Sequence, residues 1–88
     1  MTQRSAVVAS KVGLHARPAA VFVKAVTAAG IPVTIAKGDG EPVDAASILG
    51  VMTLGAGHGD EVTLTAEGEG ADTVLDELAE LLSTDLDA

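Results

Sequence analysis

The stretch RPAAVFVKAVTAAGIPVTIAK, residues 17–37, changes its hydrophobic period at Gly30. Before this glycine the apolar residues recur at spacings of one, three and four, which is typical of one face of a helix. After it, large aliphatic residues alternate with smaller or polar ones, which is typical of a half-buried strand. The predicted inward residues of this strand are Ile31, Val33 and Ile35, and the outward ones are Pro32, Thr34 and Ala36. A helix that leads directly into a strand indicates mixed α and β structure.

The helix has a start signal and a stop signal. It is expected to open just after His15, and Pro18 fits its first turn because a proline there lacks only an N–H that the helix does not use. Gly30 is suited to the C-terminal cap. The face predicted to meet the core consists of Val21, Phe22, Ala25, Val26 and Ala29.

Similar patterns predict the other elements. They are a strand from about Thr2 to Ala9, a short edge strand from Pro42 to Asp44, one or two helical turns capped by Ser47 and stopped at Gly55, a strand over residues 60–67 and a helix over residues 72–83. The buried residues of the last two are predicted to be Val62, Leu64 and Ala66, then Val74, Leu75, Leu78, Leu81 and Leu82, with Asp76, Glu77 and Glu80 outside.

The resulting order is β-α-β-β-α-β-α, with no internal repeat and no linker. Strands with a single apolar face need a cover on one side only. We therefore expect one α+β domain over residues 1–88. Its architecture is predicted to be an open-faced β-sandwich, a four-stranded antiparallel sheet covered on one face by three helices.

The composition excludes several classes of function. The chain has no cysteine, so it cannot form disulfides or thiolate metal sites, and no Trp or Tyr with which to stack on nucleic-acid bases. The net charge of -8 argues against duplex nucleic acid or anionic lipid as the main partner. Since neither a secretory signal nor a membrane span is recognisable, we expect a cytoplasmic protein.

The charges divide along the chain. The five basic residues, all within the first 38 positions, are Arg4, Lys11, Arg17, Lys24 and Lys37, and the thirteen acidic residues follow them. Two arrangements are consistent with this division. Either the two halves interleave in the folded domain and the charges pair, or a cationic surface forms around His15.

Most of the other polar motifs have a structural explanation. The glycine-rich GAGHGD, residues 55–60, leads into a strand, whereas a phosphate-binding loop should lead into a helix, so we interpret it as a turn. His58 is then a loop residue, and two distant histidines without cysteines give no metal site. Ser47 lacks the flanking glycines of a nucleophile elbow, which leaves capping as its role.

His15 is the residue whose surroundings suit a chemical task. A neutral imidazole is a good nitrogen nucleophile, so it can accept a phosphoryl group and pass it on. The backbone amides of Ala16 and Arg17 would lie at the opening of a helix, where N–H groups and the helix dipole favour an anion. The Arg17 guanidinium can add a further contact to phosphoryl oxygens.

The motifs GLHARPAA, SILGVMTLG and GDEVTLTAEGE, in this order and spacing, resemble HPr, the histidine-containing phosphocarrier family of the bacterial phosphoenolpyruvate-dependent sugar phosphotransferase system. The resemblance covers about Thr2 to Asp87 and implies the fold described above. It implies that His15 receives a phosphoryl group on Nδ1 from phospho-Enzyme I and passes it to a histidine of a sugar-specific IIA protein. Arg17 would be its electrostatic partner, and no cofactor would be needed.

The resemblance also implies a docking surface. Its apolar residues would be Ala20, Ile48, Leu49 and Met52, with Lys24 at the rim. The protein would be a monomeric carrier and not an enzyme, and it would meet membrane transporters only through their IIA components. The cationic first half would attract an anionic group and an acidic partner.

Three points stay open at this level. Ser47 matches a regulatory phosphorylation site of some family members, but Ala46 stands where many of those members have lysine, which puts this role in doubt. A paralogue serving a nitrogen-related or dihydroxyacetone-kinase relay would keep His15 and change the partners. A small regulatory ligand-binding domain, in which His15 is incidental, would instead need a pocket.

Overall fold

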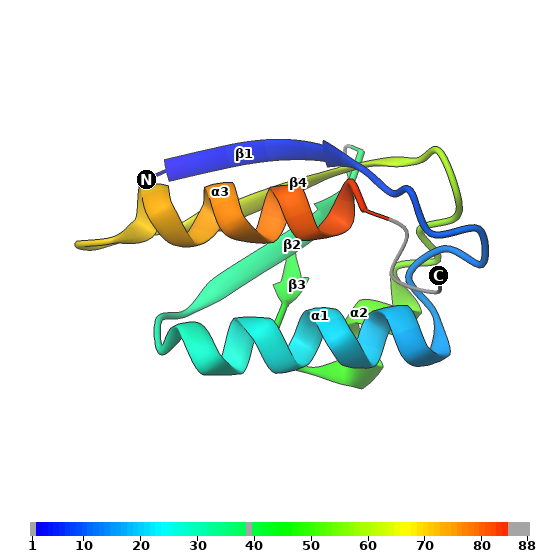
Figure 1. Cartoon of the computed structure of the whole chain (residues 1–88), viewed down its shortest axis with the longest axis horizontal. Coiled ribbons are helices and arrows are strands. Elements are labelled where there is room, and N and C mark those ends of the chain that lie inside the picture. The colour runs from blue at the N-terminus through cyan, green and yellow to red at the C-terminus, as the bar shows by residue number, and fades with distance from the viewer. Residues whose placement is uncertain (1, 39, 85–88) are drawn as a thin grey trace.

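Seven elements follow one another in the predicted order (Figure 1). They are β1 (Thr2–Val7), α1 (Ala16–Ala29), β2 (Val33–Lys37), β3 (Val43–Asp44), α2 (Ile48–Thr53), β4 (Glu61–Ala66) and α3 (Ala71–Leu82). This computed structural model describes residues 2–38 and 40–84. The last part of the predicted domain, residues 85–88, lies outside the described residues.

The strands form one antiparallel sheet in the order β1-β4-β2-β3. β4 is central, and its Leu64 is opposite Arg4 on one side and Ile35 on the other. Alternate residues of β4 are buried, and these are the predicted Val62, Leu64 and Ala66. β3 lies at an edge, where its two residues directly follow Pro42, as expected for a proline that cannot donate to a neighbouring strand.

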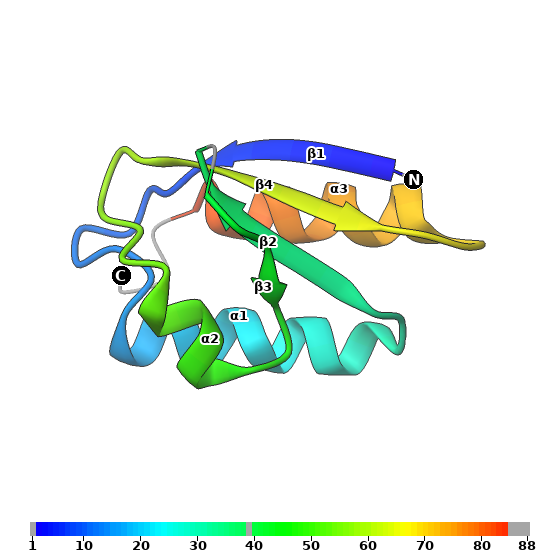
Figure 2. The same ribbon diagram turned by 180° about the vertical axis from the view of Figure 1, so that it is seen from behind.

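The helices leave one face of the sheet open. α1 and α3 lie on the same side of it (Figure 2), and α3 packs against β1 and β4. The short α2 packs against α1 and beside β3. The open-faced α+β sandwich is therefore confirmed.

The core lies between the sheet and the helices. Its largest fully buried side chain is Phe22, the one aromatic residue of the chain, which belongs to one cluster with buried aliphatic residues of the sheet and of all three helices. The fully buried set also includes Leu14, Val26, Val33, Ile35, Val51, Val62, Leu64, Leu75 and Leu82. Packing of aliphatic side chains thus holds together a chain that has no disulfide.

Some predicted strand ends were wrong. β1 ends at Val7 and not at Ala9, because the Val8 amide donates to the carbonyl of Asp60 (2.9 Å) and the Ala9 amide to the carbonyl of Leu82 (3.0 Å) instead of to a strand. β2 begins at Val33, because Gly30 is in the left-handed conformation (φ 76°) and Pro32 follows. β4 and α3 differ from the prediction by one residue at each end.

Two side chains differ in burial from the prediction. Val21 is 38% exposed, because the buried stripe of α1 runs through Ala19, Phe22 and Val26. Ala36 of β2 is buried although it alternates with the inward Val33 and Ile35, because its side chain is small and Thr63 of β4 lies opposite it. The remaining predicted core residues of α1, Ala25 and Ala29, are only partly buried.

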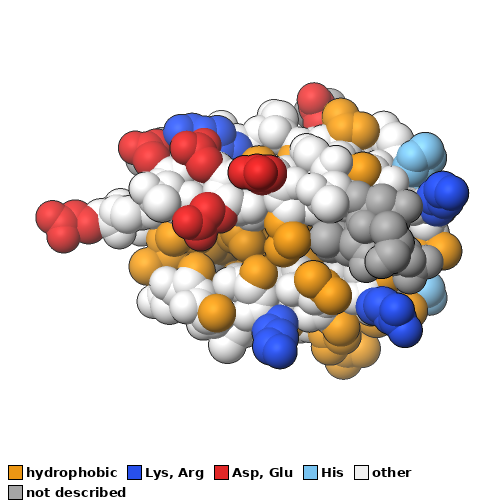
Figure 3. All heavy atoms as spheres, in the orientation of Figure 1, with side chains coloured by type: hydrophobic (Ala, Val, Ile, Leu, Met, Phe, Trp, Pro, Cys, Tyr) orange, Lys and Arg blue, Asp and Glu red, His pale blue; other side chains and the backbone are white. Residues whose placement is uncertain are grey.

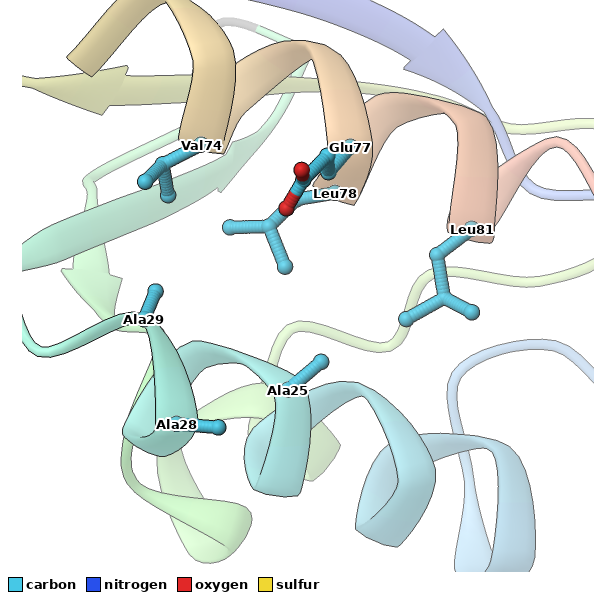
Figure 4. Close-up of a pocket in the computed structure, with 7 residues that line it drawn as sticks. All are labelled: Ala25, Ala28, Ala29, Val74, Glu77, Leu78 and Leu81. Carbon is cyan, nitrogen blue, oxygen red and sulfur yellow. The ribbon is translucent and has the colours of Figure 1, made fainter. Parts of the chain in front are cut away.

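These two alanines line a shallow groove between α1 and α3, with a volume of about 380 Å³ (Figure 4). The other lining residues are Ala28, Val74, Glu77, Leu78 and Leu81. The small side chains of α1 leave this space open opposite the leucines of α3. Among the described residues no helix is long and apolar enough to cross a membrane.

We predict that Ser10→Ala stabilises the fold. The Ser10 hydroxyl is buried and has no hydrogen-bond partner among the described residues, so its removal takes away an unsatisfied polar group. The expected gain in the free energy of unfolding is about 1 kcal/mol, measured by urea denaturation. Ser5→Ala, at an exposed position of β1, is the control and should change stability by less than about 0.5 kcal/mol. A destabilised Ser10→Ala would show that the hydroxyl is satisfied.

Candidate functional site

His15 occupies the N-cap of α1, as predicted. Its backbone is extended (φ -140°, ψ 153°), and its amide donates to the carbonyl of Gly13 (3.0 Å). Its side chain makes no capping hydrogen bond and is exposed. The imidazole therefore stands at the opening of a helix without serving as the cap, and it is free to meet a partner.

The next residue has an uncommon backbone conformation. Ala16 has φ 48°, the left-handed region, and it is the one non-glycine residue with positive φ in the part of the chain that the structure describes. For an alanine this conformation costs about 1 kcal/mol. The chain thus enters α1 through a strained turn directly beside His15, and the contacts around that turn must hold it.

Donor groups follow His15 directly in the sequence. The amides of Ala16 and Arg17 belong to the first turn of α1, where N–H groups have no acceptor within the helix. The Arg17 side chain is exposed, and the helix has no acidic residue in its first turn. The helix dipole therefore makes this end of α1 electropositive.

The basic residues divide into two groups, so both arrangements considered for the charges are partly realised. Arg4 pairs with Asp72 (3.1 Å) and Asp76 (2.7 Å) of α3, and Lys37 pairs with Asp60 (3.4 Å). The two carboxylates raise the pKa of Arg4 above its usual value. No ion pair among the described residues involves the remaining three, which are Lys11, Arg17 and Lys24.

Of these three basic residues, Lys11 precedes α1, Arg17 lies in its first turn and Lys24 lies in its second half. On the face shown in Figure 3, acidic side chains gather mainly over α3 and its approach. Histidine and most basic side chains lie at the opposite end and along the lower edge. The helix that begins after His15 therefore carries two basic residues and no acidic one, on a protein with a net charge of -8.

The short helix α2 exposes most of its predicted docking residues. Its cap is Ser47, whose hydroxyl accepts a hydrogen bond from the Gly50 amide (3.1 Å), which confirms the predicted capping role. Ile48 is 41% and Leu49 is 73% exposed. Met52 is half-buried and packs against the core, so it is less available to a partner than predicted.

The docking residues of the two helices belong to neighbouring elements. α2 packs against α1, as Figure 2 shows, and on α1 both Ala20 and Lys24 are exposed. The exposed apolar side chains of α2 thus lie on a helix that borders the helix beginning after His15. The predicted docking residues thus lie on two helices, α1 and α2, that pack against each other.

The loop after α2 supports the His15 segment. Residues 55–60 lead into β4, so the predicted turn is confirmed, and they do not open a helix as a phosphate-binding loop would. The Ala56 carbonyl accepts a hydrogen bond from the Leu14 amide (2.8 Å). A Cβ atom on Gly13 would lie 2.5 Å from that same carbonyl, so a glycine is required there. His58 is exposed on this loop.

This support was not foreseen from the sequence. The one available signal was Gly13 within the first motif, because an isolated glycine can mark a close approach of two backbones. Nothing in the pattern pointed to Ala56 as its partner.

A ligand or metal site has little support. The groove of Figure 4 includes neither His15 nor a predicted docking residue, and it offers a small molecule one carboxylate, Glu77, among aliphatic side chains. Small-molecule sites need several converging polar groups. The described residues also include no group of three or more His, Cys, Asp and Glu that could hold a metal ion.

Comparison with known proteins places the whole chain. The family model described as the PTS HPr component phosphorylation site matches residues 2–84. Phosphocarrier protein HPr of Streptomyces coelicolor is 52% identical over 87 residues, which are 99% of this chain and 94% of that protein. The HPr-like protein Crh of Bacillus subtilis is 44% identical over 79 residues, covering 90% of this chain and 92% of that one.

A solved structure agrees with the fold. The phosphocarrier protein HPr of Bacillus anthracis superimposes with a TM-score of 0.85 at 41% identity, over 92% of this chain and 95% of that one. Sequence and structure thus coincide over nearly the full length of both proteins. The chain belongs to the HPr family of phosphocarrier proteins.

Proposed function

We propose that this protein carries a phosphoryl group on His15, from phospho-Enzyme I to sugar-specific IIA proteins. In the first step an imidazole nitrogen of His15, Nδ1 as in the family, attacks the phosphorus atom. A new N–P bond forms as the bond to the donor breaks. In the second step a nucleophile of the IIA protein takes the group, and His15 returns to its free form.

The observation that carries this proposal is the unused side chain at the N-cap. An N-cap residue normally directs its side chain to the helix amides, whereas the His15 imidazole makes no such bond and is exposed. The amides of Ala16 and Arg17 then remain available for the oxygens of a phosphoryl group on His15. Arg17 would add a charge-assisted hydrogen bond.

A small domain can perform this task because phosphoryl transfer depends mainly on positioning and charge stabilisation. The proposed docking surface consists of Ala20, Ile48, Leu49 and Met52, with Lys24 at its rim. Ile48 and Leu49 support it most directly, because a monomeric protein has little reason to expose large aliphatic side chains together. The cationic surface around His15 would favour acidic partners.

The choice of partners is a separate question. The relatives include a protein named HPr-like protein Crh, so membership of the family does not by itself identify the donor. We propose the sugar phosphotransferase system, with a monomeric carrier in the cytoplasm. A paralogue of a nitrogen-related or dihydroxyacetone-kinase relay would accept phosphate from that relay's own Enzyme I counterpart and more slowly from Enzyme I of the sugar system.

We predict that phosphoenolpyruvate and Enzyme I add one phosphoryl group to His15. The modification should be labile in acid and stable in base, as expected for an N–P bond, and intact mass spectrometry measures it. His15→Ala should abolish it and His58→Ala should not, because His58 is an exposed loop residue away from any helix start. Phosphorylation that persists in His15→Ala but is lost in His58→Ala would contradict the proposal.

We predict that Leu49→Gln slows phosphoryl acceptance several-fold, on the order of 1 kcal/mol of binding free energy, while stability changes little. Val7→Gln is the matched control, because Val7 is a 51% exposed aliphatic residue on β1 and neither substitution adds charge. The measurement is the rate of phosphorylation as a function of Enzyme I concentration, together with thermal unfolding. Equal rates in the two variants would remove α2 from the docking surface.

Ser47 separates the structural role from the regulatory one. Because its hydroxyl caps α2, Ser47→Ala should lower the free energy of unfolding by about 1 kcal/mol and leave transfer nearly unchanged. Ser47→Asp keeps a capping oxygen and adds a negative charge beside Ile48, where it opposes the approach of an acidic partner. We therefore expect Ser47→Asp to remain folded but to accept phosphate markedly more slowly. Unchanged kinetics in Ser47→Asp would place Ser47 outside the docking surface.

A further inference from the structure

Lys37, the last residue of β2, reaches the loop that follows α2. Its ammonium group donates to the carbonyl of Gly55 (3.1 Å) and lies 3.4 Å from Oδ2 of Asp60. The same carboxylate oxygen accepts a hydrogen bond from the Gly57 amide (2.8 Å). We call this arrangement the Lys37–Asp60 clamp, and it holds the loop at both ends.

The clamped loop is joined to the segment that leads to His15. The carbonyl of Ala56, between the two held backbone groups, accepts the Leu14 amide at 2.8 Å. Leu14 and Ala56 are both buried, so this bond is shielded from water. Gly13 lies directly against the same backbone, since a Cβ there would be 2.8 Å from Cα of Gly57. Movement of the loop would therefore displace the residues immediately before His15.

The same loop is joined to the proposed docking helix. The Gly55 amide donates to the carbonyl of Met52 (3.3 Å), which belongs to α2, and the Gly55 carbonyl is the group that Lys37 binds. One ammonium group thus fixes the end of α2. Through Asp60 it also fixes the turn against which Gly13 packs.

We propose that Lys37 and Asp60 are positioning residues for phosphoryl acceptance, which keep His15 and the docking helix α2 in the relative arrangement that transfer needs. The inference rests on the proposed function and adds to it two residues outside the N-terminus of α1 and the docking surface. They act through Leu14 and α2. Their effect is on geometry, to which phosphoryl transfer is sensitive.

The energetics favour this role over one in global stability. Both side chains are exposed to a considerable degree, 44% for Lys37 and 40% for Asp60, and ion pairs so exposed to water stabilise a fold only weakly. The Gly57 amide, and after it Lys37, lower the pKa of Asp60, so the ionised carboxylate is the form that holds the loop. The clamp is thus a local contact whose loss leaves the core intact.

The test uses two substitutions with opposite effects on charge. Lys37→Met removes a positive charge and Asp60→Asn a negative one, so attraction of an acidic partner would be weakened by the first and strengthened by the second. Loss of positioning should slow both variants. At saturating phospho-Enzyme I we expect each to accept phosphate about tenfold more slowly than the parent. Lys37→Arg, which keeps the cation and its donors, should restore most of the rate.

Arg4→Met is the matched control. It also removes a cation with its ion pairs, but Arg4 lies on β1 and pairs with α3, at the opposite edge of the sheet from β3 and α2. Its saturating rate should equal that of the parent. A second readout is independent of Enzyme I: hydrogen exchange of the Leu14 amide should accelerate about tenfold in Lys37→Met and Asp60→Asn, with the Leu64 amide unchanged.

Each contrary result overturns a different statement. If phosphoryl acceptance becomes slower in Lys37→Met but faster in Asp60→Asn, the two residues act through electrostatic attraction of the partner and not through positioning. Faster exchange at Leu14 with unchanged rates would show that the clamp holds the loop but does not serve transfer, and unchanged exchange would show that it does not hold the segment at all. If the parent accepts no phosphate, the proposed function fails. Hydrogen exchange of the Leu14 amide would still test whether the clamp holds the loop.

Discussion

A backbone contact that only glycine permits determines where the candidate site lies. Gly13, with φ 76°, approaches the Ala56 carbonyl so closely that any side chain would displace the loop, and the Leu14 amide bonds to that carbonyl. The start of α1 is therefore located by residues from the second half of the chain. The position of His15, the strained turn at Ala16 and the course of the loop after α2 all depend on this contact.

Acidic and basic side chains are distributed unevenly over the molecule. α3 concentrates acidic residues, and Arg4 of β1 pairs with two of them. Lys37 pairs with Asp60, and the basic residues without an ion pair among the described residues lie on α1 (Arg17 and Lys24) or before it (Lys11). A protein with a net charge of -8 can therefore present basic side chains to an anionic group, and its net charge does not determine the local charge at the candidate site.

Local patterns in the sequence predicted the elements and much of the site. Gly30 and Ser47 form the predicted caps, and His15 precedes α1, because each signal involves residues close together in the chain. The clamp of Lys37 and Asp60 left no such signal, since pairs between distant residues produce no periodicity. The exposure of Val21 was missed for a related reason. Apolar residues on α1 cover more than one face, and only the tertiary packing decides which of them is buried.

The central place of β4 has a consequence for how the chain acquires its fold. β1 and β2 do not pair with each other, and both pair with β4, which comes after them in the sequence. The sheet therefore cannot assemble on a ribosome until β4 has been synthesised and has emerged. Contacts between such distant segments also slow folding, because long loops must close first. α1, by contrast, can form from local interactions, and we expect it to be transiently helical before the sheet has formed.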